Sequence, residues 1–284
     1  MVSAKFTTAG LSTLSGSTQL YRWSLDMKRH LGAILAAASF LTRLSMPQWV
    51  GKDSEAIAQA SRWFALIGLF IGVIAACLLY TFTALMGQEL AVVLTLVGII
   101  LLTGAFHEDG LADLCDGFGG GWERSRKLAI MKDSQIGAYG VLALVASFAI
   151  KVMALSQLSL SAACSALIIC HAGSRAVAGL VAVYLPYARD CDSDNKTPQK
   201  DAALPLRNRF ILCICGALPL AFLPLSAALA LLTVWLLTFI AMIKLMQRHI
   251  QGYTGDTLGA TQQIVEIAGL IFFVIYHFQI TVSP

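Results

Sequence analysis

The chain has 284 residues, of which 57% are hydrophobic and only 13% charged, and its mean hydropathy is +0.74. About a quarter of the residues in a soluble domain are charged, so this composition excludes an ordinary soluble protein and predicts an integral membrane protein. The net charge of +4 is too small to suggest a nucleic-acid partner. At ~20 residues per span, the length suits six to eight spans in one all-α, polytopic helical bundle within the lipid bilayer.

The N-terminal end divides into two parts. Residues 1–26 are rich in Ser and Thr and carry no acid before Asp26, which is typical of a targeting segment or of an over-long gene start before Met27. We assign this tail no role and treat residues 27–284 as a single transmembrane domain. Residues 31–42 are apolar, flanked by basic residues and too short to cross a bilayer, so a short re-entrant or interfacial helix is expected there.

Seven later apolar stretches predict membrane spans, at approximately 63–86, 90–106, 137–158, 162–184, 210–223, 225–246 and 264–281. The loops 107–136, 185–209 and 247–263 are basic, whereas the alternate connections carry no Lys or Arg. The positive-inside rule then places the basic loops in the cytoplasm and the C-terminus on the far side. The candidate polar clusters all fall on the cytoplasmic side, which suits chemistry on cytosolic substrates better than a transport path.

Four acids fall within nine positions directly after an apolar run, namely Glu108, Asp109, Asp113 and Asp116. If the helix of that run continues, Asp109, Asp113 and Asp116 share one face at i, i+4 and i+7. Carboxylates so close repel each other unless a cation neutralises them, and Mg²⁺ binds through a few carboxylates plus substrate phosphates. The glycines of residues 117–121 end the helix and let backbone approach a ligand. The alternative is a solvated acidic helix end.

Two further polar segments each open a predicted span. Lys132, Asp133 and Ser134 precede the span near 137; Asp133 or Ser134 fits a helix N-cap, and the same helix end favours anions such as diphosphate. Asp256 lies in the glycine-rich segment 252–260, where it would cap the last helix or complete a metal or substrate site. The glycines around it favour the functional interpretation.

Isolated polar residues also fall inside the apolar stretches. Charges within the membrane are costly and usually face a partner or a polar cavity. We interpret Lys151 as half of a buried ion pair, while for Arg175 both an ion pair and phosphate binding stay open. His107 and His171 are interpreted as structural. The seven cysteines show no CxxC spacing and fit packing rather than zinc binding or disulfides.

Several separated motifs, in order, resemble the adenosylcobinamide-GDP ribazoletransferase family, also called cobalamin 5′-phosphate synthase. They are FLTRLSMP (40–47), FHEDGLADLCDG (106–117), IMKDSQIGAYG (130–140), SR (174–175) and TGDTLGA (254–260). The resemblance covers roughly residues 30–270. It implies a catalytic domain over 27–284, in the inner membrane of bacteria, that joins adenosylcobinamide-GDP to α-ribazole or its 5′-phosphate, with Mg²⁺ and release of GMP.

The resemblance also implies roles for individual residues of this chain, namely those that match the family's motifs. Its acidic motif is matched by Asp109, Asp113 and Asp116, its second motif by Lys132, Asp133 and Ser134, and its third by Asp256. Glu108 stands where relatives often have an apolar residue, so it is not carried over as a ligand.

The expected mechanism follows from the chemistry of phosphoryl transfer, which needs positioning and charge neutralisation. Magnesium on Asp109, Asp113 and Asp116 would bridge the diphosphate, with Asp116 as a candidate proton acceptor. Lys132 and Arg175 would hold phosphate oxygens.

Two alternatives remain. A CDP-alcohol phosphotransferase also uses acids at a helix end, but its motif places an Ala-Arg pair where Ala112 is here followed by Asp113. An ion-coupled transporter would use Lys151, Arg175 and Glu266 as a relay, although no internal repeat supports it. The sequence allows an oligomer without specifying one.

Overall fold

The computed structural model describes residues 16–47, 49–50, 60–189 and 204–282. Within these ranges the chain is helical, and its only β pairing is an isolated bridge between Tyr187 and Tyr253, so the predicted all-α class is confirmed. The α-helices are α1 Gly16–Leu41, α3 Phe64–Met86, α4 Gln88–Thr103, α5 Phe106–Gly120, α6 Arg124–Ile130, α7 Ala138–Gln157, α8 Leu160–Tyr184, α9 Leu206–Ala217, α10 Leu225–Ile250 and α11 Gly255–Val282. Two 3-10 helices, Ser61–Trp63 and Leu218–Phe222, precede α3 and α10.

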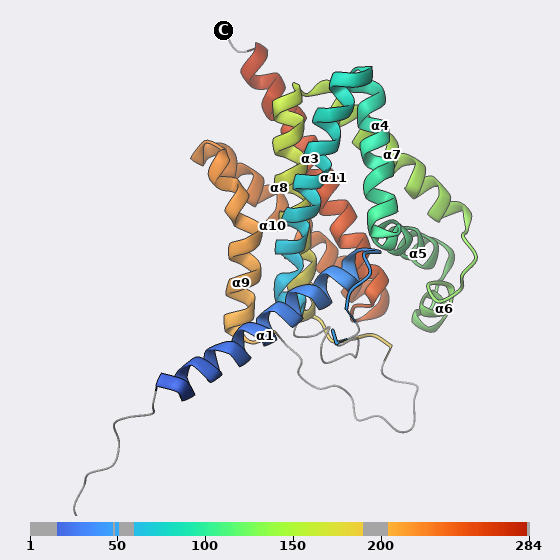
Figure 1. Ribbon diagram of the computed structural model, residues 1–284. Coiled ribbons are helices and arrows are strands. Elements are labelled where there is room, and N and C mark those ends of the chain that lie inside the picture. The colour runs from blue at the N-terminus through green and yellow to red at the C-terminus, as the bar shows by residue number, and fades with distance from the viewer. Residues whose placement is uncertain (1–15, 48, 51–59, 190–203, 283–284) are drawn as a thin grey trace, which may run out of the picture.

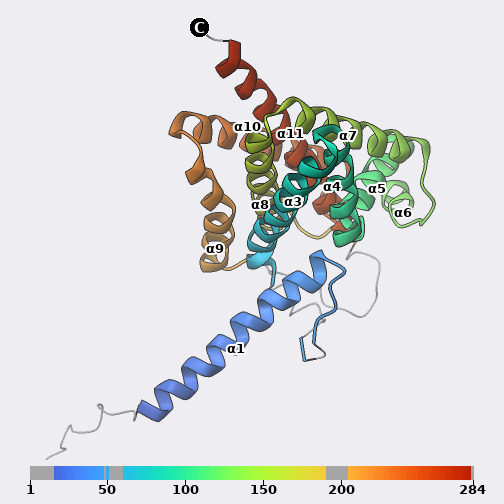
Figure 2. The ribbon, with the colours of Figure 1, turned by 45° about the horizontal axis from the view of Figure 1, so that its top comes forward.

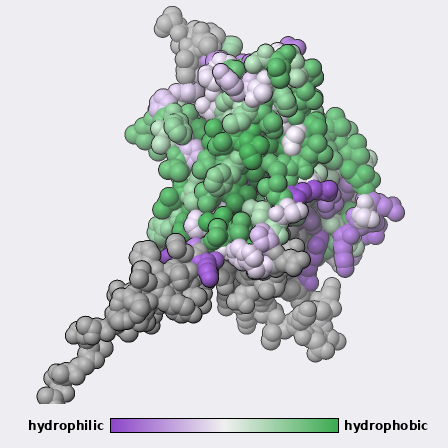
Figure 3. All heavy atoms as spheres, viewed as in Figure 1, coloured by the Kyte–Doolittle hydropathy of each residue, from purple (hydrophilic) through white to green (hydrophobic). Residues whose placement is uncertain are grey.

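Five of the described helices, α3, α7, α8, α10 and α11, are long and apolar enough to cross a membrane, and the bent pair α4–α5 makes a sixth if counted as one span. The predicted count of seven is not confirmed. The stretch predicted at 210–223 forms the twelve-residue α9 and a 3-10 turn, and α9 spans only about 18 Å against a hydrocarbon core of ~30 Å. In Figure 3, hydrophobic residues coat the flank of the bundle, as expected for a multi-pass membrane protein.

The basic loops gather at one end of the bundle. In Figure 1, α5, α6 and the first turn of α11 lie at the lower end, whereas the short connections between α3 and α4 and between α7 and α8 lie at the upper end. Hydrophilic residues gather at the lower end, near α6, in Figure 3. The basic loops therefore lie at one end of the bundle, and the connections without Lys or Arg lie at the other end. Part of the basic loop 185–209 lies outside the described residues.

The helix expected at 31–42 is the end of a longer one. α1 begins at Gly16, before the boundary predicted at residue 27, and Figure 2 shows it crossing below the ends of the bundle helices and projecting beyond them. Its apolar part is His30–Leu41. The first 15 residues of the N-terminal tail lie outside the described residues.

Helix α8 is the most enclosed of the five spans, and glycines let its neighbours approach it. A Cβ at Gly68 or Gly72 of α3 would meet the backbone of α8 at His171 and Ile168. On α8 itself, a side chain at Gly173 would meet the ring of Trp235. Small residues spaced by four allow such close packing of helices in membranes. The small-residue run of α8 therefore packs helices within this one chain.

A sharp bend between α4 and α5 positions the acidic motif. Both linking residues are left-handed, Gly104 with φ +70° and Ala105 with φ +59°, and the two helix axes meet at 89°. A left-handed alanine is uncommon, and the bend is supported by the Arg43 N–H, which donates to the Leu102 carbonyl at 2.8 Å. From the sequence, the helix of the apolar run could continue into the acidic motif, but it ends at the bend. Helix α5 is a separate helix that lies across the end of the bundle.

Candidate active site

Helix α5 crosses the first turns of α11 at very short range. A Cβ at Gly110 would lie 2.6 Å from the Asp256 carbonyl oxygen, and one at Gly259 would lie 3.3 Å from the Cα of His107. Only glycine fits at such a crossing. The crossing brings the acidic motif of α5 and the glycine-rich segment of α11 together, although the two lie far apart in the sequence.

Three carboxylates gather at this crossing. Asp109 is exposed, and Asp113 and Asp256 are half-buried. Burial and, to a smaller extent, the negative charges of Asp109 and Asp256 together raise the pKa of Asp113 to about 7, against an opposing effect of Arg189. We call Asp109, Asp113, Asp256 and the neighbouring Arg189 the acidic corner. It holds more negative charge than its single arginine neutralises.

Arg189 closes the far side of this corner. Its Nη2 donates to Asp256 Oδ2 at 2.6 Å, forming an ion pair, and makes a longer contact of 3.4 Å with the Met131 carbonyl. Its Nε is buried and has no hydrogen-bond partner among the described residues. The loop that carries Arg189 is held in turn by Arg124, which donates to the carbonyls of Ala188 and Ile250 at 2.7 and 2.8 Å.

The corner fits magnesium by its chemistry, as an open site rather than a closed cage. Among the described residues, no three Asp, Glu, His or Cys side chains converge closely enough to hold an ion. Magnesium does not need such a cage, because it is commonly held by one or two carboxylates together with substrate phosphates and water. Asp109 and Asp113 supply two hard oxygen donors one helical turn apart. The raised pKa of Asp113 marks a place where a cation would stabilise the charged form.

Asp116 points away from this corner into the protein. Its Oδ2 accepts the Gly137 N–H at 2.7 Å and its Oδ1 accepts the Gly140 N–H at 2.9 Å. These are free N–H groups of the first turn of α7, so Asp116 caps that helix from across the fold. Asp133 and Ser134, the N-caps considered from the sequence, do not cap α7, because the helix begins only at Ala138. Asp116 as a third metal ligand stays a prediction, since each of its oxygens retains another lone pair.

The second motif lies in the exposed link between α6 and α7. Lys132, Asp133 and Ser134 are all exposed, and Asp133 Oδ1 accepts the Gln135 N–H at 3.1 Å. The Arg189 contact to the carbonyl of Met131 places the start of this link beside the acidic corner. The phosphate-binding role of these residues stays a prediction.

Arg175 belongs to a different cluster, inside the bundle. Its Nη1 lies 3.1 Å from His171 Nδ1, and Lys151 forms an ion pair with Glu266 at 2.7 Å, which confirms the interpretation of Lys151. Glu266 also lies 3.2 Å from His171 Nδ1, and Gln263 bridges Lys151 to Glu108 with hydrogen bonds of 2.7 and 3.0 Å.

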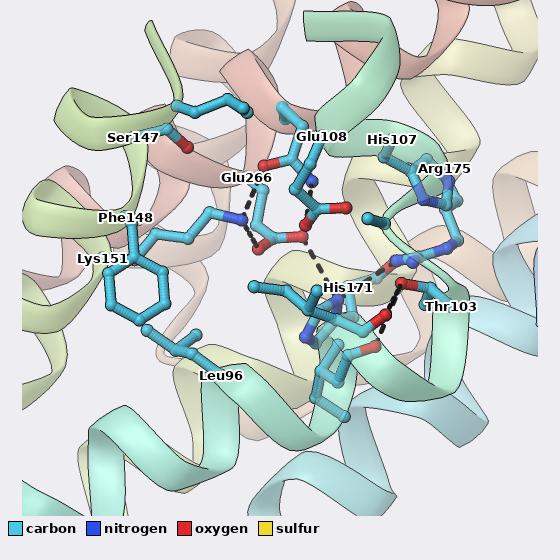
Figure 4. Close-up of a pocket in the computed structure, with 15 residues that line it drawn as sticks. Leu96, Thr103, His107, Glu108, Ser147, Phe148, Lys151, His171, Arg175 and Glu266 are labelled. Atoms are coloured by element: carbon cyan, nitrogen blue, oxygen red, sulfur yellow. Dashed lines mark hydrogen bonds and ion pairs between the residues drawn. The ribbon is translucent and has the colours of Figure 1, made fainter. Parts of the chain in front are cut away.

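These side chains border a cavity of about 240 Å³ behind α5. Figure 4 shows Lys151, Glu266, Glu108, His171 and Arg175 around this space. The three residues of the transporter alternative thus lie in one cluster, where Glu266 is already held by several partners.

A third feature lies at the C-terminal end of α5. A surface pocket of about 330 Å³ is lined by Phe118, Gly119, Gly121, Trp122, Lys127, Arg248 and His249. The rings of Phe118 and His249 stack at 4.4 Å, and Trp122 is 95% exposed. Two cations and an exposed aromatic ring are suited to phosphate and to a stacking base.

Sequence reasoning missed several of these residues. Gln263 had a usable signal, since it lies one helical turn before Glu266 within an apolar stretch and polar residues at that spacing share one face. Arg189 had none, because it is one of several basic residues in its loop and only its ion pair distinguishes it. The pocket residues Lys127 and Arg248 were likewise counted only as loop charges.

The chain is similar to known proteins over most of its length. The family described as Cobalamin-5-phosphate synthase matches residues 33–274. Relatives named "Adenosylcobinamide-GDP ribazoletransferase" include those of Shewanella sp. (strain W3-18-1), 42% identical over 84% of this chain and 92% of the relative, and of Shewanella piezotolerans, 40% identical over 87% and 96%. That of Shewanella frigidimarina is 43% identical over 84% and 92%.

No solved structure matches the chain. The family match covers the acidic helix, the α6–α7 link, α8 and the start of α11, which together build the acidic corner and the cavity. The chain belongs to the cobalamin-5-phosphate synthase family and is a multi-pass membrane transferase of cobalamin biosynthesis.

Proposed function

We propose that the chain joins adenosylcobinamide-GDP to α-ribazole, or to its 5′-phosphate, with release of GMP and with magnesium as cofactor. The observation that carries this proposal is the order of features along α5. The cavity borders Glu108, the acids Asp109 and Asp113 follow, and the cationic pocket begins at Phe118. From Glu108 to Phe118 the helix rises about 15 Å, a length suited to an acceptor, a diphosphate and a nucleoside laid end to end.

The reaction makes and breaks one bond each. A hydroxyl oxygen of ribazole bonds to the phosphorus that carries cobinamide, and the bond from that phosphorus to the bridging oxygen breaks. GMP leaves with the bridging oxygen, and the hydroxyl proton passes to a carboxylate of the site. Such a transfer depends on positioning and charge stabilisation rather than on a covalent enzyme intermediate.

The chain's own residues supply the positioning. Asp109 and Asp113 would hold the magnesium, and Arg189, fixed by Asp256, offers its unpartnered Nε–H to a phosphate oxygen. Lys127 and Arg248 would bind the phosphates of the guanosine end beside the exposed ring of Trp122. Magnesium, when bound, supplies the positive charge that polarises the diphosphate and stabilises the leaving GMP.

The side of the membrane follows from loop charge. The acidic corner lies at the end of the bundle where the basic loops gather, and basic loops favour the cytoplasm. We therefore place the site at the cytoplasmic face of a bacterial inner membrane, where water-soluble nucleotides reach it.

The test is turnover by purified protein in lipid nanodiscs. With GDP-activated cobinamide, ribazole 5′-phosphate and Mg²⁺, we expect GMP and a cobalamin phosphate in equal amounts. EDTA should stop the reaction and added Mg²⁺ should restore it. Release of CMP from a CDP-alcohol under the same conditions, without GMP from the corrinoid, would favour the phosphotransferase alternative and refute the proposal.

A further inference from the structure

The residues that line the cavity behind α5 have no role in the reaction steps described above. It is enclosed by α4, α5, α7, α8 and α11. One wall is apolar and includes Leu96, Ile99, Leu144 and Phe148, while the opposite wall carries the polar cluster around Glu266. Figure 4 shows Leu96 and Phe148 on one side of the space, with Lys151 extending from beside Phe148 to Glu266.

Three polar atoms bordering the cavity have no hydrogen-bond partner among the described residues: Glu108 Oε2, His171 Nε2 and Arg175 Nε. His171 and Arg175 are only 4% and 3% exposed. Buried polar groups are nearly always paired, so this wall is suited to a ligand that offers both an acceptor and a donor. Water at this wall would pair these atoms but would leave the apolar wall without a partner, so a ligand with one apolar and one polar side fills the cavity better.

Size and charge restrict the ligand further. A cavity of 150 Å³ holds benzene, so at the same ratio about 240 Å³ takes a flat ring system of about ten heavy atoms. Two carboxylates and two cations border the space, and their formal charges cancel. A neutral, bicyclic aromatic ring fits this volume, whereas a corrin is far too large.

The position of the cavity connects it to the reacting groups. Glu108 is the residue before Asp109 on α5, and its carboxylate is held by Gln263 with its second oxygen unpaired. A molecule with its ring in the cavity and a sugar at Glu108 would therefore present its hydroxyls beside the acidic corner.

We propose that this cavity binds the benzimidazole ring of the ribazole acceptor, an assignment that rests on the proposed function. The ring packs against the apolar wall, and its sugar-free nitrogen accepts the Arg175 Nε–H. Glu108 Oε2 accepts a ribose hydroxyl, which orients the sugar toward the acids. The site selects the acceptor by the size and neutrality of its base.

The direct test is binding of free 5,6-dimethylbenzimidazole to the full chain in nanodiscs, measured by calorimetry. Ser147 is buried and lines the cavity, so Ser147→Leu should raise the Kd at least about tenfold by occupying the ring's space. Ala146→Leu, at an exposed neighbouring position of α7, is the matched control and should leave the Kd unchanged. In turnover, Ser147→Leu should raise the KM for ribazole and not the KM for the corrinoid.

A second variant tests the assignment independently, in case Ser147→Leu does not fold. Phe148→Ala enlarges the cavity and should raise kcat/KM for a ribazole built on the larger naphthimidazole ring, relative to the natural base. The assignment is overturned if dimethylbenzimidazole binds wild type and Ser147→Leu equally, or if no binding is detected while GMP is released normally. Binding of the base without GMP release from any corrinoid would instead refute the proposed reaction and leave the cavity assignment standing.

Discussion

Asp116 and Asp113 stand one helical turn apart in the same motif, and the structure gives them opposite tasks. Asp116 accepts two backbone N–H groups of α7 at 2.7 and 2.9 Å and is 8% exposed. Asp113 is half-buried at the acidic corner. Replacing each by asparagine should therefore separate stability from catalysis within one motif.

The magnitude for Asp116→Asn follows from its two bonds. An amide has one acceptor oxygen and a donor NH₂, so either orientation of the new side chain turns a donor toward Gly137 or Gly140. Added atoms at both glycines would collide with the carboxylate, so no space exists for a rescuing water. Losing a hydrogen bond to a charged group and leaving its partner unpaired costs about 3 kcal/mol, which corresponds to roughly 5 °C in Tm at this chain length.

The assay is thermal unfolding in detergent micelles, followed by tryptophan fluorescence, for wild type, Asp116→Asn and Asp113→Asn. We expect the loss of Tm in Asp116→Asn alone. Asp113→Asn should keep its Tm, because it removes a charge that neighbouring carboxylates repel, yet it should lose turnover. Equal Tm values for wild type and Asp116→Asn would refute the helix-capping role.

Three further outcomes test the other parts of the structure. Asp109→Asn should lower GMP release at least ~100-fold, on the scale of a lost electrostatic stabiliser, with unchanged expression and Tm; near-normal release would contradict its place at the metal. Glu266→Ala should lower the free energy of unfolding by about 3–5 kcal/mol, because it leaves the buried charge of Lys151 without its partner. A double variant with Lys151→Met should recover that stability, and failure to recover it in unfolding experiments would argue against the ion pair. Gly110→Leu should separate α5 from Asp256 and abolish both turnover and the protection of this crossing against amide exchange, whereas retention of both would show that the crossing is not needed.

The class of the protein and most of its helices can be predicted from the sequence. Hydropathy is summed along a continuous segment, so membrane insertion of a stretch such as 162–184 is a local property that residue order reveals. The shared face of Asp109 and Asp113 is equally local, because it depends only on the 3.6-residue period within one helix. The alternation of basic and uncharged loops along the sequence also agrees with the structure, because each loop joins the ends of adjacent helices.

The contacts between polar groups, in contrast, depend on how the helices pack. The 89° bend between α4 and α5 depends on two left-handed residues, Gly104 and Ala105. No periodic pattern in the sequence predicts this bend. That bend directs Asp116 to a helix end 21 residues later, brings Asp113 to Asp256, and leaves Arg175 in a separate cluster around the cavity. Partners of this kind are chosen through space by helix packing, because a buried charge or an open helix end takes the nearest group that satisfies it, wherever that group lies in the chain.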